Sequence, residues 1–392
     1  MKRITVIIIT FILLLNSPIS FADTKVNVNA RAALLIEETS GEVLFSKNVK
    51  ERFAPASITK LMTYLVAIEA VEKGKVSLED IVTISDQAAN EKGASYRLKA
   101  GEKIKLRELI ETMMIVSAND AAFAIAEHVG VSMENFVRMM NEKAKELGMV
   151  DTHFVNPNGM PEVGEGNRMS AKDIGILAKY IIQHHKEEIL PLTDQEFYQN
   201  SKRNFYKKST NGLLKVIPNV DGLKTGYTSE AGFCLTSTMN VNKESEDEKD
   251  FRLISVILGT KSDWSRVRES EKLLNYGMDN FIKKRIIKVK EPIEEINLWE
   301  SKELPIKLLA KENAWGFGEK DKIEKGREVA LLEEMPFPIV KGQKLGEVKV
   351  TLYNDKVITM DLISDRDVKK IPFKVFIKNF WSVLGSLISN VM

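Results

Sequence analysis

The sequence has 392 residues, of which 44% are hydrophobic and 29% are charged, a composition typical of a folded globular protein rather than a disordered chain. Its 57 basic and 55 acidic side chains nearly balance, so the overall charge gives no argument for a nucleic-acid partner. The single cysteine, Cys234, excludes an intrachain disulfide, and the four histidines form neither an HExxH pattern nor a Cys/His cluster. We therefore expect no metal and no other cofactor.

The first 22 residues have the three-part pattern of a secretory signal peptide. Lys2 and Arg3 precede an apolar run at residues 4–15, and residues 20–22 (Ser-Phe-Ala) place small side chains beside a cleavage point after Ala22. The apolar run is too short to span a bilayer comfortably, and an uncleaved anchor is the alternative. We expect an exported protein.

The next 260 or so residues alternate between strand and helix patterns. A hairpin is predicted at residues 32–45, with Gly41 in the turn, and a helix at 57–73 is predicted to end at Gly74. Further helices are predicted at 106–129, 133–147, 170–184 and 264–281, and further strands at 233–240 and 251–258. This order predicts an α+β domain in which early and late strands share one sheet.

After residue 284 the pattern changes to short strands separated by turn residues. Strands are predicted at 285–289, 329–332 and 348–352, and residues 353–356 (Tyr-Asn-Asp-Lys) indicate a tight turn. We therefore expect a signal peptide at 1–22, a catalytic domain at 23–284, a small all-β domain at 285–368 and a C-terminal helix at 369–392.

Three short motifs carry chemical meaning, and each is weak evidence alone. Residues 57–60 (Ser-Ile-Thr-Lys) begin a predicted helix, so Ser57 and Lys60 lie one turn apart on the same face. A serine hydroxyl needs a base to become a good nucleophile, and a lysine amine can be that base if burial or a second cation lowers its pKa. Residues 117–119 (Ser-Ala-Asn) interrupt an apolar stretch, and residues 224–226 (Lys-Thr-Gly) precede a predicted strand.

The conjunction of the three motifs, in this order and at spacings of about 60 and 100 residues, is typical of penicillin-binding proteins and serine β-lactamases. The residues around the motifs, with the stretch at 154–160 (Phe-Val-Asn-Pro-Asn-Gly-Met), resemble the low-molecular-mass D-alanyl-D-alanine carboxypeptidases over nearly the whole chain. The resemblance implies a β-lactamase/transpeptidase-like catalytic domain. It also implies a serine peptidase of peptidoglycan synthesis and cell-shape maintenance.

The resemblance assigns the reaction to a few residues. Ser57 would attack the carbonyl between two terminal D-alanines, with Lys60 as its general base, and an acyl-enzyme would form and then be hydrolysed by water. Ser117 would relay a proton towards the leaving amine, and Asn119 would hold the substrate amide and help to orient Lys60. Penicillin would acylate the same serine.

The resemblance also implies a site for the substrate carboxylate and the oxyanion. Lys224 would supply positive charge, Thr225 would bind the terminal carboxylate, and Gly226 would let the substrate approach the backbone closely. The backbone amides of Ser57 and Tyr227 would form the oxyanion hole. Tyr227 departs from many relatives, which have another side chain at this position, and this change could alter substrate preference.

A further arginine of the family, which holds the carboxylate, lies shortly before the last helix of the catalytic domain. Arg266 fits the spacing from Leu273 better, and Arg268 stays open as the alternative.

The C-terminal segment has separate polar and apolar sides when it is drawn as a helix. Phe380, Trp381 and Leu384 belong to the apolar side, and four lysines lie near the start, at 369, 370, 374 and 378. This pattern predicts an interfacial helix that attaches the protein to the outer face of the bacterial cytoplasmic membrane. A helix packed on the protein itself is the alternative.

Three other functions are compatible with parts of the sequence. A serine β-lactamase would need a glutamate that activates the deacylating water, and Glu162 and Glu165 lie in the relevant stretch without the usual Glu-x-x-x-Asn pattern. A D,D-endopeptidase would use the same motifs. A non-catalytic peptidoglycan-binding protein would need neither Ser57 nor Lys60.

Overall fold

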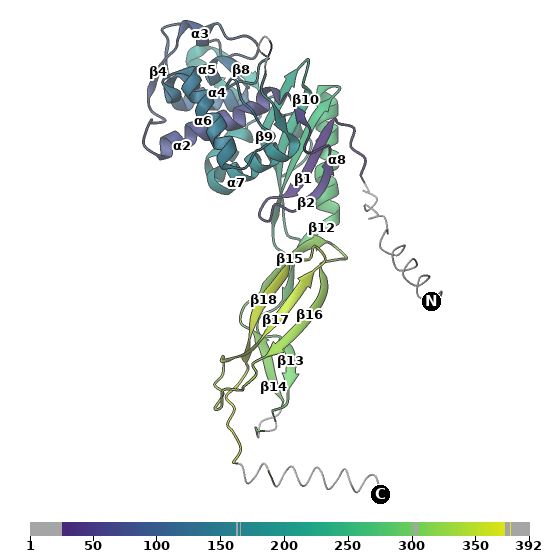
Figure 1. Ribbon diagram of the computed structural model, residues 1–392. Coiled ribbons are helices and arrows are strands. Elements are labelled where there is room, and N and C mark those ends of the chain that lie inside the picture. The colour runs from purple at the N-terminus through teal and green to yellow at the C-terminus, as the bar shows by residue number, and fades with distance from the viewer. Residues whose placement is uncertain are drawn as a thin grey trace, which may run out of the picture. The chain divides into compact units, whose positions relative to one another are not determined.

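The computed structural model describes residues 26–161, 164, 166–298, 300–301, 305–372 and 377 (Figure 1). The predicted signal peptide and nearly all of the predicted C-terminal helix therefore lie outside the described residues. The chain forms two compact units. The first runs up to Met239 and includes Arg252–Tyr276, and the second comprises Asn240–Phe251 and the chain from Gly277 onward.

The first unit is built on a five-stranded sheet whose strand order is β2-β1-β11-β10-β9. Its strands are β1 (Ala32–Glu37), β2 (Val43–Lys47), β9 (Val220–Thr228), β10 (Gly232–Val241) and β11 (Phe251–Thr260). Strand β1 pairs antiparallel with both β2 and β11, which confirms that early and late strands share one sheet. The predicted hairpin is also confirmed, with Gly41 at a φ of +72° in its turn.

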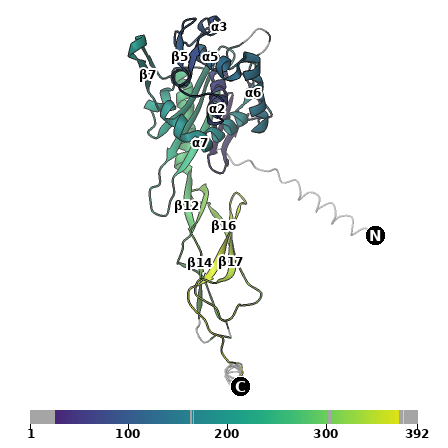
Figure 2. The same cartoon turned by 90° about the vertical axis from the view of Figure 1, so that its left-hand side faces the viewer.

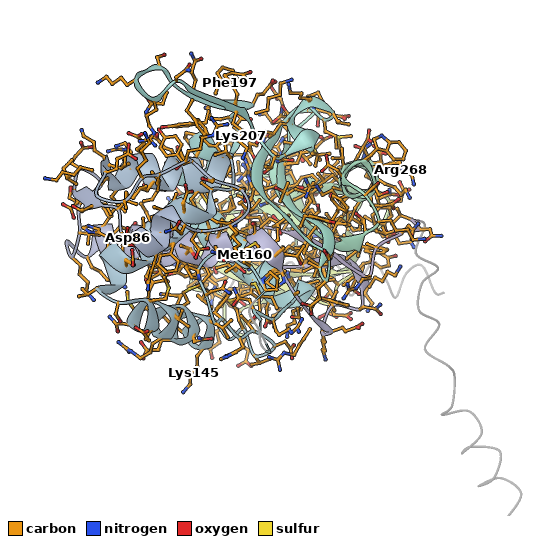
Figure 3. All side chains as sticks on the ribbon, turned by 90° about the horizontal axis from the view of Figure 1, so that it is seen from above. Asp86, Lys145, Met160, Phe197, Lys207 and Arg268 are labelled. Atoms are coloured by element: carbon orange, nitrogen blue, oxygen red, sulfur yellow. The ribbon has the colours of Figure 1, made fainter. Side chains whose placement is uncertain are left out.

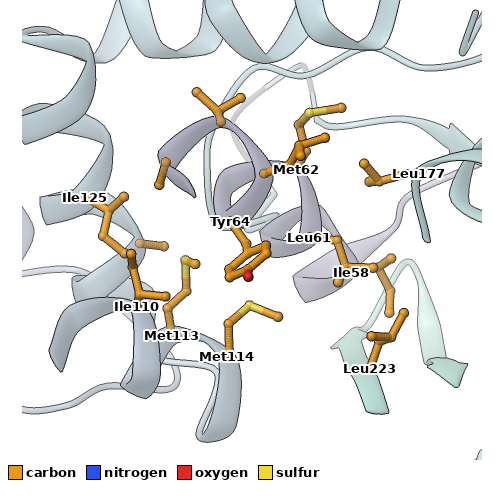
Figure 4. Packing of buried hydrophobic residues seen from close by; sticks show 14 of the residues in the cluster. Ile58, Leu61, Met62, Tyr64, Ile110, Met113, Met114, Ile125, Leu177 and Leu223 are labelled. Atoms are coloured by element: carbon orange, nitrogen blue, oxygen red, sulfur yellow. The ribbon is translucent and has the colours of Figure 1, made fainter. Parts of the chain in front are cut away.

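Helices cover both faces of this sheet, as Figures 1 and 2 show, with α8 on one side and most of the others on the opposite side. The helices are α2 (Lys60–Glu72), α3 (Asp86–Ala89), α4 (Leu106–Ile115), α5 (Asn119–Gly130), α6 (Met133–Glu146), α7 (Ala171–Thr193) and α8 (Asp263–Asn280). Helix α2 is buried over nearly its whole length, because apolar side chains occupy all of its faces. Figure 4 shows Leu61 and Tyr64 of this helix together with Met113 of α4 in the buried core.

The prediction of one continuous helix at residues 106–129 is wrong, because the chain breaks between α4 and α5. Ser117 has a φ of +63°, in the left-handed region, and Ala118 has a ψ of 121°, so neither residue continues a helix. The apolar periodicity hides this break because both helices bury residues in the same core. The break therefore coincides with the Ser-Ala-Asn motif.

Short elements connect the main ones. The two-residue to four-residue strands form three small antiparallel pairs: β3 (Arg52–Phe53) with β6 (Met169–Ser170), β4 (Ile81–Thr83) with β5 (Lys103–Lys105), and β7 (Phe197–Asn200) with β8 (Phe205–Lys208). Three 3₁₀ turns are η1 (Ala56–Thr59), η2 (Ser201–Arg203) and η3 (Gly212–Lys215). Helix α7 extends nine residues beyond the predicted end at His184, with non-helical dihedral angles at His185.

The second unit is an antiparallel β structure. One sheet has the order β13-β14-β18-β17-β16, and β12 pairs with β15. Its strands are β12 (Phe281–Ile287), β13 (Pro292–Ile296), β14 (Ile306–Ala310), β15 (Ala314–Glu319), β16 (Glu324–Leu331), β17 (Lys344–Leu352) and β18 (Val357–Ser364). The predicted turn at residues 353–356 joins β17 to β18, with Asp355 at a φ of +61°. Across the described residues of both units, every helix is too short or too polar to cross a membrane.

One loop of the first unit packs tightly on the 3₁₀ turn η1. Gly159 has a φ of +80°, and a Cβ added there would lie 1.9 Å from the carbonyl oxygen of Ala56. Thr63 donates its hydroxyl proton to the carbonyl of Pro157 at 2.6 Å, which fixes the same loop on α2. Ala56 itself has a φ of +49°. The packing therefore requires a glycine at position 159.

We predict that Gly159→Ala destabilises the first unit by about 2–4 kcal/mol, because it combines a left-handed backbone with a steric overlap. Gly148→Ala is the matched control. Gly148 also has a positive φ, of +73°, but no atom lies within 4 Å of its added Cβ. The control should cost only the left-handed strain, about 1–2 kcal/mol. Calorimetric unfolding measures both, and equal costs would contradict the packing described here.

Candidate active site

Ser57 lies in η1, immediately before α2, and Lys60 is the first residue of that helix. The chain therefore passes from a 3₁₀ turn to an α-helix within the motif, where the sequence predicted a single helix. The Nζ atom of Lys60 lies 2.8 Å from the Oγ atom of Ser57. The structure thus brings together the two residues predicted to act as nucleophile and base.

The amine of Lys60 has no solvent-exposed surface and contacts three oxygen atoms. Besides Ser57, it lies 2.7 Å from Oδ1 of Asn119 and 2.8 Å from the carbonyl oxygen of Asn158. Asn119 comes from the start of α5, and Asn158 from the loop that packs on η1. Sequence analysis gave Asn158 no role, although it lies in the stretch at 154–160 that supported the resemblance.

Burial holds the pKa of Lys60 well below the usual range of a lysine, and the positive charge of Lys224 lowers it further. The carboxylates of Asp120 and Glu91 oppose this shift in the pKa of Lys60. Burial and a second cation are the two conditions under which a lysine amine becomes a base. Both conditions are present around Lys60.

The residues of the second motif lie at the break between α4 and α5. Because Ser117 is in the left-handed region, its short turn brings both Ser117 and Asn119 to the wall of the same cleft. The side-chain amide of Asn119 donates to the carbonyl of Lys92 at 2.6 Å, and its backbone N–H donates to the carbonyl of Ala94 at 2.6 Å. These bonds fix the orientation of the Oδ1 atom that faces Lys60.

The third motif lies inside strand β9, whereas the sequence analysis placed it before a strand. Strand β9 is at one edge of the sheet and runs beside η1. A Cβ added to Gly226 would lie 2.8 Å from the carbonyl oxygen of Pro55 and 3.2 Å from the backbone nitrogen of Ile58. Glycine therefore allows the edge strand to approach the turn that carries Ser57.

Lys224 is only 1% exposed, and its pKa is lowered to about 7 by burial and by the positive charges of Arg266 and Lys207. The hydroxyl of Thr225 lies 2.5 Å from that of Thr210. Lys224, Arg266 and Lys207 thus place three cationic side chains on or beside β9. Thr225 of the same strand lines the cleft. This arrangement suits a carboxylate ligand.

Arg266, and not Arg268, reaches the cleft. Arg266 is almost fully buried in α8 and donates to the carbonyl of Gly226 at 3.1 Å, and it forms an ion pair with Asp263. The guanidinium of Arg268 lies 4.4 Å from the centre of the Trp264 ring. Figure 3 shows Arg268 towards the edge of the first unit, whereas Lys207 and Met160 lie near its middle.

The cleft between these elements has a volume of about 580 Å³. Its lining includes seven of the residues predicted for the site: Ser57, Ser117, Asn119, Thr225, Gly226, Tyr227 and Arg266. Tyr227 is 54% exposed, and its ring packs 4.2 Å from that of Phe233 at the rim. Sequence analysis missed the opposite wall, formed by Gly93, Ala94, Met160 and Pro161, and also missed Thr210. Glu162 and Glu165 lie outside the described residues.

Comparison with known proteins agrees with this geometry. Residues 19–262 match the family described as D-alanyl-D-alanine carboxypeptidase, and residues 281–370 match the C-terminal domain of penicillin-binding protein 5. The D-alanyl-D-alanine carboxypeptidase DacF of Bacillus subtilis is 33% identical over 388 residues, which cover 96% of this chain and 97% of that protein.

Two solved structures illustrate the likeness in three dimensions. Penicillin-binding protein 5 of Haemophilus influenzae is 30% identical, with a TM-score of 0.66, over 88% of this chain and 99% of that one. Penicillin-binding protein D2 of Listeria monocytogenes, solved in a cefotaxime-bound form, is 30% identical, with a TM-score of 0.57, over 64% of this chain and 98% of that one. The α+β fold with its second, β-rich unit, the cleft and these matches together place the chain in the D-alanyl-D-alanine carboxypeptidase family of penicillin-binding serine peptidases.

Proposed function

We propose that this protein removes the terminal D-alanine from peptidoglycan stem peptides through an acyl-enzyme on Ser57. Membership of the carboxypeptidase family supports the reaction. The observation that carries the assignment to particular residues is the buried amine of Lys60, 2.8 Å from the hydroxyl oxygen of Ser57.

The partners of Lys60 explain how it would act as a base. A neutral amine has two N–H groups and one lone pair. Asn119 Oδ1 and the carbonyl of Asn158 can only accept hydrogen bonds, so they take the two N–H groups. The lone pair is then directed at the third neighbour, the hydroxyl of Ser57. In this state Lys60 is oriented to receive the proton of Ser57 as the serine oxygen attacks.

The proposed reaction then proceeds in two halves. The serine oxygen bonds to the carbonyl carbon between the two D-alanines, and its proton passes to Lys60. The C–N bond breaks, Ser117 relays a proton to the leaving amine, and D-alanine departs. Water then hydrolyses the ester on Ser57. The backbone amides of Ser57 and Tyr227 would hold the oxyanion, and such donors are each worth about 10²–10³ in rate.

The cations around β9 would select the substrate by its terminal carboxylate. Thr225 would donate its hydroxyl, Lys224 of the same strand would supply positive charge, and Arg266 of α8 would add to it. A β-lactam presents a carboxylate and a strained amide in a similar arrangement, so penicillin should acylate Ser57. The cefotaxime-bound and ampicillin-bound forms of the Listeria protein support this part of the proposal.

We also propose that the protein works at the outer face of the bacterial cytoplasmic membrane. A signal peptide at residues 1–22 would direct export, and the helix at 369–392 would attach the protein peripherally. The catalytic domain at 23–284 and the β domain at 285–368 would lie outside the membrane. The sequence patterns of the two ends support this arrangement.

We predict that Ser57→Ala abolishes the covalent penicillin adduct and that Lys60→Ala slows its formation by about 10²–10⁴-fold, the usual loss for a positioned base. Lys73→Ala is the matched control, because Lys73 directly follows the same helix but is exposed to solvent and pairs with Glu69. Intact-protein mass spectrometry follows the adduct. Normal acylation of folded Lys60→Ala would contradict the proposed base, and an adduct on another residue would contradict the nucleophile.

The rate of penicillin acylation should fall at low pH as Lys60 becomes protonated, and we call this part of the pH–rate profile the acidic limb. We predict that Lys224→Met moves the acidic limb to higher pH by roughly one unit. The charge of Lys224 lowers the pKa of Lys60, so its removal raises that pKa and keeps Lys60 protonated to higher pH. Acylation rates measured between about pH 5 and 10 locate the limb. A slower variant with an unmoved limb would show that Lys224 binds substrate without affecting Lys60.

We predict that deletion of residues 373–392 releases a soluble enzyme that still hydrolyses small peptides ending in D-Ala-D-Ala. Replacing Phe380, Trp381 and Leu384 together by serine should have the same effect, because buried apolar surface contributes roughly 25 cal/mol per Å². Sedimentation with membranes after signal cleavage provides the measurement. A truncated protein that stays with membranes, or that is soluble but inactive on small peptides, would contradict the proposed anchor.

A further inference from the structure

Asp120 is a buried charge beside the candidate active site that sequence analysis did not single out. It follows Asn119 in the first turn of α5, and its side chain is 1% exposed. Its carboxylate accepts a hydrogen bond from the hydroxyl of Ser95 at 2.7 Å. It also accepts the backbone N–H of Tyr96, which lies 3.0 Å from each carboxylate oxygen, and the backbone N–H of Leu98 at 3.1 Å. These neutral donors satisfy the carboxylate without cancelling its charge.

These hydrogen bonds attach one wall of the cleft to α5. Gly93 and Ala94 line the cleft, and the segment that follows them is the one held by Asp120. Arg97, in the middle of that segment, has a φ of +61°, a conformation that surrounding contacts must maintain. Asn119 binds the start of the same segment through the carbonyls of Lys92 and Ala94. Asp120 and Asn119 therefore act on one segment from two adjacent positions of the helix.

The same segment also connects to the hairpin β7–β8. The ring of Tyr96 is buried and packs edge-on at 4.7 Å from Phe205 and at 5.7 Å from Tyr198, while its hydroxyl donates to Glu108. Strand β8 of this hairpin carries Lys207, one of the cations near Lys224. Asp120 thus lies where α5, the cleft wall and the hairpin meet.

The charge of Asp120 also acts on Lys60. Five elements place charged groups around the two buried lysines. Strand β9 carries Lys224, α5 carries Asp120 and the loop after α3 carries Glu91, while Arg266 of α8 and Lys207 of β8 act on Lys224. Burial and Lys224 lower the pKa of Lys60, and Asp120 and Glu91 oppose them. If the pKa of Lys60 were lowered further, more of its amine would be neutral, but that amine would be a weaker proton acceptor.

We propose that Asp120 is a positioning residue: it orients Asn119 and the cleft wall, and its fixed negative charge sets the strength of Lys60 as a base. This inference rests on the proposed role of Lys60. It assigns to Asp120 a function in the reaction beyond the stability of α5.

The test is the pH dependence of penicillin acylation in Asp120→Asn, which keeps the shape of the side chain and removes its charge. The acidic limb should move to lower pH by about half a unit to one unit, because the charge that favours protonated Lys60 is gone. The rate on the plateau should fall about tenfold, because the base is weaker and the wall is less well held. This shift is opposite in direction to the one expected for Lys224→Met.

Asp173→Asn is the matched control. Asp173 is also fully buried in the first turn of a helix, and it accepts the N–H of Asp151 and the hydroxyl of Thr152, each at 2.8 Å. It is absent from the charges that act on Lys60. Asp173→Asn should lower the melting temperature and leave the limb in place. An Asp120→Asn protein that behaves in the same way would overturn the proposal.

Ser95→Ala keeps the proposal testable if Asp120→Asn does not fold. It removes one hydrogen bond to the carboxylate and retains the charge, so the plateau rate should fall several-fold with the limb unmoved. An unchanged plateau rate would then overturn the proposal. Wild-type protein that forms no adduct on Ser57 would instead contradict the proposed function, so the two failures are distinguishable.

Discussion

A lysine amine without solvent contact, held among three oxygen atoms, is the interaction on which the candidate active site depends. Charging this amine requires removal of an ammonium ion from water, so burial favours its neutral form. The carbonyl oxygens of Asn119 and Asn158 then determine which way its lone pair points. In the proposed mechanism, activation of Ser57 therefore depends on where three separate segments of the chain place their oxygen atoms.

The fold brings these segments together through unusual backbone positions. Ala56 and Ser117 have positive φ values, and Gly226 and Gly159 lie where a Cβ would overlap the turn that carries Ser57. Residues held in such conformations cost free energy and persist only when the surrounding core maintains them. The buried helix α2, packed on all sides, provides that support.

The sequence predicted that early and late strands share one sheet, and it predicted most helices, because apolar periodicity follows burial. It did not predict strand β9. The three motifs were recognised by their residues and spacing, which are typical of the family. It did not predict the break at Ser117, since α4 and α5 share one core and the periodicity continues across them. It also gave no role to Asn158, whose contribution comes from a backbone carbonyl that every residue type possesses. Asp120 and the wall at residues 93–98 were missed because their contacts depend on tertiary structure alone.

Protein labelled with ¹³C at the lysine Cε atoms would test the central claim most directly, by an NMR titration of the free enzyme. We predict one resonance, identified by its loss in Lys60→Arg, that titrates far below the value of about 10.4 of exposed lysines. In Lys224→Met the same resonance should titrate at higher pH. If the Lys60 resonance instead titrates together with the exposed lysines, the amine is charged at neutral pH and cannot take the proton of Ser57 as described.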